Sequence, residues 1–462
     1  MSGLADLPAA RVVAGYRSGE FSPVDVVAAV LARVEAAEPV LGATYAYDPD
    51  GARTAARESE RRWARGEPLG PVDGVPATIK DNIATRGVPV LLGTAATEPV
   101  PAAADAPAAA RLREAGAVFV AKTTMPDYGM LSSGVSSAHQ LARNPWNPLR
   151  TPGGSSSGAG AAAAAGYGPL HLGTDIGGSI RLPAGWCGIV GLKPSFGRVP
   201  VDPPYYGRAV GPMTRSAADA ALAMSVIAAP DERDHTALPP AALDWSTPEV
   251  ELRGLRLGLL LDQRVGLDVD PEVTAAVESA AAAFAAAGAE VVPVEPFLTR
   301  EMLDGLDRFW RFRAWSDLLA LPAARRELVL PDIARWASSV RDATAAEVFH
   351  GFSRMDAIAS AAHAALGGLD FLLSPVAPIP AFPADAAYPT GDPLRPLEHI
   401  AFTLGANMSG QPAASVNCGW TADGSPVGLQ ITGRRFDDTG VLRMVAAFER
   451  IGPEPPRWPE FG

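Results

Sequence analysis

The stretch from Thr151 to Pro194 constrains this chain more than any other. It contains two Gly-Gly-Ser units, Gly153–Ser155 and Gly177–Ser179, on either side of an almost pure Ala/Gly run. Glycine adopts backbone conformations closed to other residues and lets a ligand or a second backbone approach closely. A serine directly after a glycine pair can therefore lie at a tight bend with its neighbouring N–H groups pointing inward. An oxyanion hole needs this geometry.

The segment between the two units predicts a buried helix. Gly158 to Gly166 has good helix formers inside and glycine at both ends. Its small side chains suit close packing against a sheet. A flexible linker is the alternative for a Gly/Ser-rich segment, but the apolar flanks at 170–173 and 189–192 favour packing. The stretch matches neither a Walker phosphate loop nor a G-x-S-x-G nucleophile elbow.

A third feature lies upstream, where an apolar strand-like run, Val75 to Ile79, ends in Lys80. A lysine at a strand end is ordinarily solvated, but a serine nucleophile needs a base. The six histidines form no recognisable pattern, and Ser–Lys pairs are an alternative to Ser–His–Asp. Lys122, which follows a second predicted strand at 117–121, is another candidate base.

These features together resemble the amidase signature family of Ser–Ser–Lys hydrolases. The resemblance rests on the Lys80 segment, on GGSSSG at 153–158 and on DIGGSIRLPA at 175–184. It extends over most of the chain through NPW at 144–146, GLKP at 191–194, GPMTR at 211–215, SP at 374–375, GQPA at 410–413 and PVGLQ at 426–430. Ser157 departs from the family, where many members carry glycine, and we expect little effect from it.

The resemblance implies a role for each catalytic residue. Ser179 is the nucleophile, Ser155 the relay and Lys80 the general base, with a cis peptide at Gly154–Ser155. The backbone N–H groups of Ser179 and of the three residues before it are expected to line the oxyanion hole: Ile176, Gly177 and Gly178.

A lysine base must be uncharged, and burial disfavours the ammonium form and lowers the pKa. We therefore expect hydrolysis to fail below neutral pH and to improve as the pH rises. Asp175 and Arg181 flank the nucleophile and are expected to form an ion pair that braces the loop, with Thr174 hydrogen-bonding nearby. No cluster of metal ligands is present in these motifs, so the sequence predicts no cofactor and no metal.

Aromatic residues are candidates for an apolar substrate pocket that would take an aryl or alkyl acyl group. The candidates, with one methionine, are Tyr128, Met130, Trp186, Tyr205, Tyr206 and Trp420. Residues 300–365 are expected to be helical, and their aromatic cluster, which includes Trp310 and Trp336, favours a core position because aromatics dominate cores.

The pattern of strands and helices predicts a single large α/β domain over residues 1–462. The expected architecture is an α/β/α sandwich whose central mixed, mostly parallel sheet is covered by helices, as βαβ alternation implies. Residues 1–65 would form an N-terminal helical layer, 66–230 the core with the catalytic residues, and 231–462 the rest of the sheet and the pocket helices. The segments at 407–416 and 428–432 are expected to complete the sheet.

The net charge and the cysteine content indicate which classes of partner and which cellular compartment to expect. The net charge of −12 and the pI near 5.1 argue against direct nucleic-acid binding. Two cysteines make no disulfide framework and fit a reducing compartment. With no signal peptide and no membrane span in the sequence, we expect a cytoplasmic protein.

Three functions remain open from the sequence. The leading one is a free-standing amidase that acts on a small-molecule amide. Because homodimers are common in the family, the resemblance is also compatible with a homodimer. The alternative is the glutamine-hydrolysing A subunit of a tRNA-dependent amidotransferase. That subunit usually carries Ser-Ser-Leu-Asp-Gln before Gly-Pro-Met-Thr-Arg, whereas this chain has PPYYGRAV at 203–210. A non-enzymatic binding protein is the third, and nothing favours it because all three catalytic positions are filled.

Overall fold

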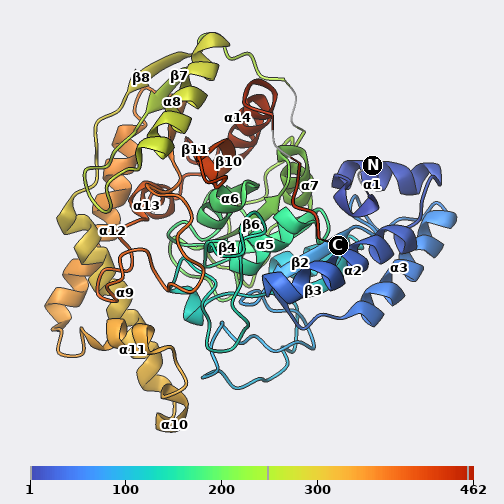
Figure 1. Cartoon of the computed structure of the whole chain (residues 1–462), viewed down its shortest axis with the longest axis horizontal. Helices are drawn as coiled ribbons and strands as arrows, with labels where there is room; N and C mark the ends of the chain where they lie inside the picture. The colour runs from blue at the N-terminus through green and yellow to red at the C-terminus, as the bar shows by residue number, and fades with distance from the viewer. Residues whose placement is uncertain (1–2, 247–248, 455–456, 462) are drawn as a thin grey trace.

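A mixed sheet of eleven strands runs through the molecule (Figure 1) in the computed structural model, which describes residues 3–246, 249–454 and 457–461. The strands, in their order across the sheet, are β1 (Thr44–Tyr45), β3 (Val118–Thr123), β2 (Pro76–Lys80), β4 (Leu170–Asp175), β6 (Ala209–Thr214), β5 (Val190–Lys193), β10 (Ala413–Trp420), β11 (Pro426–Gly433), β9 (Phe371–Pro375), β7 (Arg256–Leu259) and β8 (Glu290–Pro293).

Helices pack on both faces of the sheet, and others extend beyond its two ends. In chain order the α-helices are α1 (Ala9–Ser18), α2 (Pro23–Leu41), α3 (Pro49–Ala64), α4 (Pro107–Glu114), α5 (Ser157–Ala165), α6 (Arg181–Cys187), α7 (Ala217–Ile227), α8 (Pro271–Ala286), α9 (Arg300–Ala320), α10 (Ala323–Arg326), α11 (Pro331–Ser338), α12 (Ala345–Ala365), α13 (Ala401–Met408) and α14 (Asp438–Ile451). Two 3₁₀ turns, Leu4–Asp6 and Asp127–Gly129, complete the helical elements of the described residues.

The predicted α/β class and mixed sheet are confirmed, but the sheet is not mostly parallel. Parallel pairs lie toward its two ends, where β2 pairs with β3 and β4, and β7 pairs with β8 and β9. The centre is antiparallel, from β4 through β6, β5, β10 and β11 to β9. A parallel pair needs a long crossover connection, whereas β10 and β11 are joined by a short turn at 421–425.

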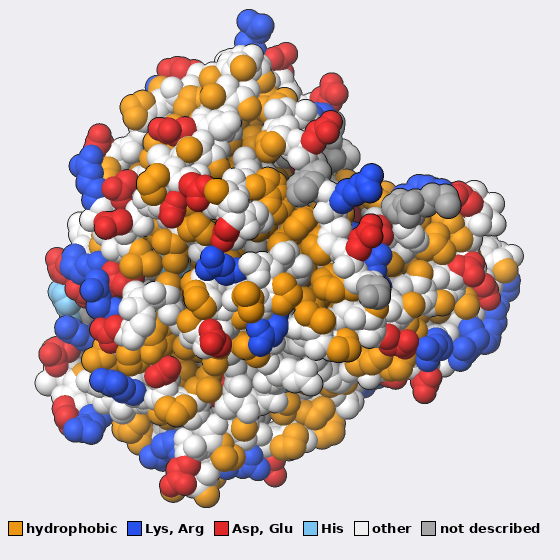
Figure 2. All heavy atoms as spheres, viewed as in Figure 1, with side chains coloured by type: hydrophobic (Ala, Val, Ile, Leu, Met, Phe, Trp, Pro, Cys, Tyr) orange, Lys and Arg blue, Asp and Glu red, His pale blue; other side chains and the backbone are white. Residues whose placement is uncertain are grey.

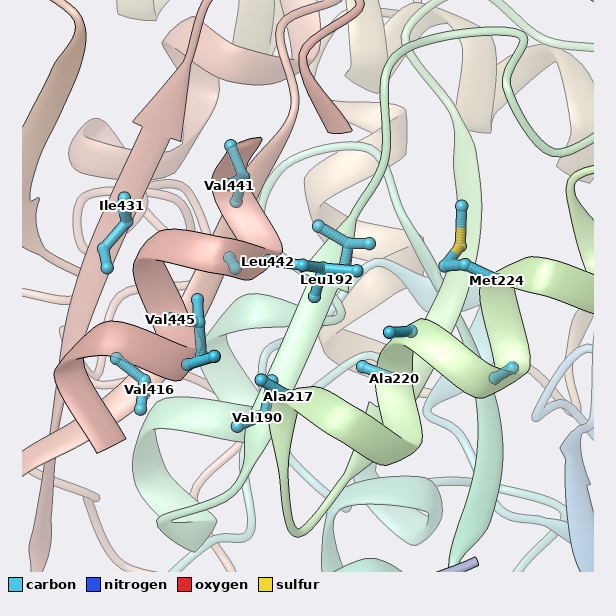
Figure 3. Packing of buried hydrophobic residues seen from close by; sticks show 14 of the residues in the cluster. Val190, Leu192, Ala217, Ala220, Met224, Val416, Ile431, Val441, Leu442 and Val445 are labelled. Atoms are coloured by element: carbon cyan, nitrogen blue, oxygen red, sulfur yellow. The ribbon is translucent and has the colours of Figure 1, made fainter. Parts of the chain in front are cut away.

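One face of the sheet is covered by α4, α7, α8 and α14 and carries the largest apolar core. Figure 3 shows the centre of this core, where α14 and α7 lie over the central strands. The contacting side chains are Val190 and Leu192 of β5, Val416 of β10, Ile431 of β11, Ala217, Ala220 and Met224 of α7, and Val441, Leu442 and Val445 of α14.

The other face of the sheet centre is covered by α5 and α6, which follow the two Gly-Gly-Ser units. Every residue of α5 is buried, as the alanine run predicts. Gly158 has no room for a side chain, because a Cβ there would lie 2.1 Å from the carbonyl oxygen of Ala43. The small residues let α5 lie against the sheet and hold the 153–156 segment close to the end of β2.

The predicted N-terminal helical layer is present as α1 to α3, which lie at one side of the molecule (Figure 1). Helix α2 begins with the capping box that Ser22 and Asp25 form. The sequence missed the two-residue strand β1, which pairs antiparallel with β3 at the sheet edge.

Helices α9, α11 and α12 lie on the opposite side of the molecule from α1–α3 (Figure 1). The prediction that the sheet resumes at residue 407 is wrong, because Asn407 belongs to α13 and β10 begins at Ala413. On the face seen in Figure 2, the Lys and Arg side chains are interspersed with Asp and Glu. No helix in the described part of the chain is long and apolar enough to cross a membrane.

Candidate active site

Lys80 is the last residue of β2 and lies buried beneath the Gly/Ser segments. Its side chain is 0% exposed. The Nζ atom lies 2.9 Å from each of three hydroxyl oxygens, those of Ser155, Ser156 and Thr174. The structure therefore brings Lys80, Ser155 and Thr174 together as the sequence predicted, and it adds Ser156, whose hydroxyl the sequence analysis did not single out.

Burial holds the pKa of Lys80 well below its usual value, and the nearby charge of Arg208 lowers it further. The carboxylates of Asp175 and Asp81 act in the opposite direction, but burial outweighs them. The three hydroxyls offer hydrogen bonds without a compensating negative charge in direct contact. This environment favours an uncharged amine, which can accept a proton.

Ser155 and Ser156 precede α5, and a cis peptide joins Gly154 to Ser155 as expected from the resemblance. The hydroxyl of Ser156 donates to the carbonyl oxygen of Thr174 at 3.2 Å. The backbone N–H of Ser156 donates to the carbonyl oxygen of Ser179 at 3.2 Å. These two bonds tie the first Gly-Gly-Ser unit to the second.

Ser179 lies in the turn between β4 and α6 and lines the same cavity as Ser155. The backbone N–H groups of Ile176, Gly177 and Ser179 donate to no protein acceptor among the described residues. That of Gly178 donates to Asp175 Oδ1 at 2.9 Å. The expectation that Gly178 lines an oxyanion hole is therefore wrong in this structure, because its N–H already has an acceptor.

The Asp175–Arg181 ion pair is present and fully buried, with both side chains 0% exposed. Arg181 Nη2 and Nε donate to the two carboxylate oxygens at 2.9 and 3.0 Å. This charge pairing keeps the pKa of Asp175 below its usual range despite burial. The guanidinium also donates to three groups that the sequence did not identify: Thr403 O, Gln430 Oε1 and Asn407 Oδ1. Arg181 thus fixes the Ser179 turn to α13 and β11.

Part of the wall of the cavity beside Ser155 and Ser179 is apolar. Tyr128 and Met130 line it, as predicted. Trp310 and Trp336 are buried in a hydrophobic core, as predicted, and in addition line this cavity, which was not predicted. The remaining apolar side chains of the wall are Leu131, Ile176, Leu397 and Ile400.

Four other aromatic residues proposed for the pocket lie outside the cavity wall. Trp186 packs against Phe382 in the core, and Trp420 packs edge-on against Trp146. Tyr206 is exposed. Tyr205 is not part of the wall, but its ring lies against two arginine side chains that are.

Lys122, the second candidate base, lies apart from the two serines. Its Nζ donates to the carbonyl oxygen of Ile83. It lines a groove beside β3 rather than the cavity of Ser155 and Ser179. Burial lowers the pKa of Lys122 to about 7, so a shifted pKa alone does not separate the two lysines, whereas their contacts do.

Sequence reasoning missed two cavity arginines, Arg208 and Arg313, and the network residue Asn407. Arg208 lies in the segment at 203–210 that departs from the amidotransferase pattern, and this departure was the available signal. Nothing in the sequence indicates that Arg313, in the middle of α9, lines the same cavity as Ser179.

Comparisons with known proteins agree with this geometry. A family model described as Amidase matches residues 25–442. The chain is 36% identical to the A subunit of the glutamyl-tRNA(Gln) amidotransferase from Chloroflexus aurantiacus, over 98% of each chain. A bacterial aryl acylamidase of the amidase signature family superposes with a TM-score of 0.88 at 31% identity, over 96% of each chain. The corresponding A subunit from Thermotoga maritima gives 0.82 at 26% identity, over 100% of this chain and 99% of that one. These superpositions confirm the predicted fold.

Proposed function

Because the chain belongs to the amidase family, we propose that it hydrolyses a carboxylic acid amide to the acid and ammonia or an amine through an acyl-enzyme on Ser179. One observation carries the proposal: the buried Lys80 amine contacts the Ser155 hydroxyl at 2.9 Å, and Ser155 lines one cavity with Ser179. A nucleophile, a relay and a base in this order are the parts that acyl transfer needs.

The hydrogen bonds around Lys80 favour Ser155 as the relay. An uncharged lysine amine has two N–H donors and one lone pair, so one of its three hydroxyl partners must donate to it. Ser156 already donates to the carbonyl oxygen of Thr174, and the hydroxyl of Thr174 contacts the side-chain amide of Asn82. Ser155 has no other side-chain hydrogen bond among the described residues. Its hydroxyl proton is therefore the one available to Lys80.

In the proposed reaction the proton moves along these groups in order. Ser179 Oγ attacks the amide carbon while its proton passes to Ser155 Oγ, and the proton of Ser155 passes to Lys80 Nζ. The N–H groups of Ile176, Gly177 and Ser179 receive the developing oxyanion, and losing one such donor typically costs about 3 kcal/mol in the barrier. The protonated Lys80 returns a proton through Ser155 to the leaving nitrogen. Water then hydrolyses the ester by the same relay in reverse order.

A panel of aryl and alkyl amides, analysed by intact mass, tests this proposal. We expect an acyl adduct that maps to Ser179 and disappears in Ser179→Ala. Lys80→Ala and Ser155→Ala should slow acylation strongly, since general-base catalysis contributes about 10²–10⁴-fold. Lys122→Met is the matched control and should acylate at the wild-type rate. An adduct that persists in Ser179→Ala, or equal losses in the two lysine variants, would contradict the assignment.

The second candidate is the glutamine-hydrolysing component of an amidotransferase, and the curated relatives favour it over a free-standing amidase. The identity of 36% to the A subunit of such an enzyme extends over 98% of each chain. The same three catalytic residues would release ammonia from glutamine for a partner protein. Purification of the chain with its bound partners from its native cells, followed by a glutaminase assay of the free and the complexed protein, separates the two. Glutaminase activity that appears only with a co-purified partner would establish the second.

A further inference from the structure

Of two arginines in the wall of the cavity, one has no acidic partner among the described residues and the other has only a long ion pair. Arg208 precedes β6 and Arg313 lies on α9, and both line the cavity with Ser155 and Ser179. Among the described residues, the side chain of Arg208 makes no hydrogen bond and no ion pair. Arg313 Nε lies 4.0 Å from Oδ2 of Asp317. The Asp317 side chain is 51% exposed, so water weakens this ion pair.

The two guanidinium groups lie against the same aromatic ring. Both face the ring of Tyr205, with their central carbons 5.2 Å (Arg208) and 4.1 Å (Arg313) from its centre. Burial, and after it the charge of Arg313, lower the pKa of Arg208 to about 10, although the carboxylate of Asp317 acts in the opposite direction and an arginine stays charged in proteins. Two neighbouring cations repel each other, and this repulsion is relieved when an anion binds between them.

No carboxylate of the cavity wall is free to neutralise this charge. Asp175 is the acidic residue among the described lining residues. Its two oxygens already accept from Arg181, Asn407 and three backbone N–H groups, those of Gly178, Ile180 and Arg181. The buried indole N–H of Trp310, which also lines the cavity, has no acceptor in the described part of the chain. The cavity therefore offers several hydrogen-bond donors that lack acceptors.

We propose that Arg208 and Arg313 bind a carboxylate on the acyl part of the substrate, so that the enzyme prefers amides of dicarboxylic acids to neutral amides. The inference rests on the proposed amide hydrolysis. The planar guanidinium fork matches a carboxylate and binds it through two parallel hydrogen bonds. The acyl part stays in the cavity through both acylation and deacylation, so a carboxylate there is held throughout the reaction. The apolar wall of Met130, Leu397 and Ile400 suits the methylene groups between the two carbonyl carbons.

The same charges disfavour a substrate that carries an ammonium group. An amino acid with a side-chain amide, such as glutamine, would place its α-ammonium in a cavity with two cations and, among the described lining residues, no carboxylate free to pair with it. Glutaramate differs from glutamine only by the absence of that ammonium, and pentanamide lacks the carboxylate as well. The comparison of glutamine with glutaramate therefore measures the effect of the ammonium, and the comparison of glutaramate with pentanamide measures the effect of the carboxylate.

The experiment measures kcat/KM of the full-length wild-type protein on the three amides, together with succinamate and adipamate to set the chain length. A charge-assisted hydrogen-bond pair predicts that the best dicarboxylic monoamide exceeds its methyl-ended counterpart by about 10- to 100-fold. Glutaramate should also exceed glutamine. Equal rates on glutaramate and pentanamide, or a preference for glutamine, would overturn the inference.

Variants connect the preference to the two arginines. Arg208→Met and Arg313→Met should each reduce the ratio of glutaramate to pentanamide, mainly through KM, and Arg208→Lys should restore part of it. Arg341→Met is the control, because this side chain is 68% exposed and lies outside the cavity. An unchanged ratio in both methionine variants would overturn the inference, and the wild-type ratio decides the matter if the variants do not fold. If pentanamide and glutaramate are hydrolysed equally well, the carboxylate site is refuted but the proposed amide hydrolysis is not. No hydrolysis and no Ser179 adduct with any amide refutes the proposed function as well.

Discussion

Replacing Arg181 by methionine tests how the turn that carries Ser179 is held in place. The guanidinium donates five hydrogen bonds, to both oxygens of Asp175 and to Thr403, Gln430 and Asn407. Methionine keeps much of the volume and removes every donor. Asp175 would then keep only its backbone N–H donors and Asn407 around a buried negative charge.

The expected loss of unfolding free energy follows from this uncompensated charge. Hydrogen bonds to charged groups contribute about 1.5–3 kcal/mol each, but their sum overstates the effect because burying the guanidinium has its own desolvation cost. Removing one partner of a buried ion pair typically costs about 3–5 kcal/mol. We expect Arg181→Met to lose this amount, with a matching loss of Ser179 reactivity as the turn loosens.

Urea unfolding, followed by tryptophan fluorescence, measures the loss. Asp175→Asn removes the charge that Arg181→Met leaves unpaired, so the double variant should lose about 1–3 kcal/mol less than the sum of the single variants.

The pH dependence of the unfolding free energy has a definite sign. The lowered pKa of Asp175 stabilises the wild type above about pH 4, and this contribution is lost as the pH falls, so the gap to Arg181→Met should narrow in acid. A loss below about 1 kcal/mol, or additive variants, would refute the reasoning.

Two further predictions concern Lys80 and Gly178. Because the folded pKa of Lys80 is lowered, the unfolded chain binds one more proton between that pKa and about 10.4, so the wild-type unfolding free energy should rise with pH across this window. Urea unfolding of Lys80→Met should show a smaller rise, since the buried Lys122 and Lys193, whose pKa values are also lowered, still contribute. Parallel curves for the two proteins would contradict the lowered pKa of Lys80. Gly178→Ala places a side chain at φ +116°, with its Cβ 2.6 Å from Thr403 Oγ1. The backbone strain alone should lower the unfolding free energy by roughly 1–3 kcal/mol. The clash should in addition displace the turn and abolish acylation of Ser179. Gly424→Ala, at φ +81° with nothing within 4 Å, carries similar strain and should retain acylation, and equal effects would rule out a local role for Gly178.

The sequence predicted those parts of the site that depend on local pattern. Glycine pairs mark the tight turns, the alanine run marks the buried helix α5, and strand β2 ends at Lys80 as expected. The ion pair of Asp175 and Arg181 was also predictable, because the two residues lie six positions apart around one turn.

The parts that failed depend on contacts between distant segments. Asn407 joins the Arg181 network as part of α13, whereas the sequence placed it at the start of a strand, and a short apolar run does not distinguish helix from strand. Trp310 and Trp336 are buried and also line the cavity, a combination that aromatic spacing in a helix does not reveal. The N–H of Gly178 donates to Asp175 rather than facing the cavity, which depends on atomic positions within the turn.

The proton path from Ser179 through Ser155 to an uncharged Lys80 is best tested by the rate at which a serine-reactive sulfonyl fluoride labels Ser179 as a function of pH. Labelling needs nucleophile activation but no leaving amine, so its pH dependence reports the base directly. We predict a single labelled residue, Ser179, and a rate that falls about tenfold per pH unit below an inflection well under the usual lysine pKa of about 10.4. The pH dependence should vanish, with most of the rate, in Lys80→Ala. A rate that is flat between about pH 5 and 9 in the wild type, or unchanged in Lys80→Ala, would contradict the account.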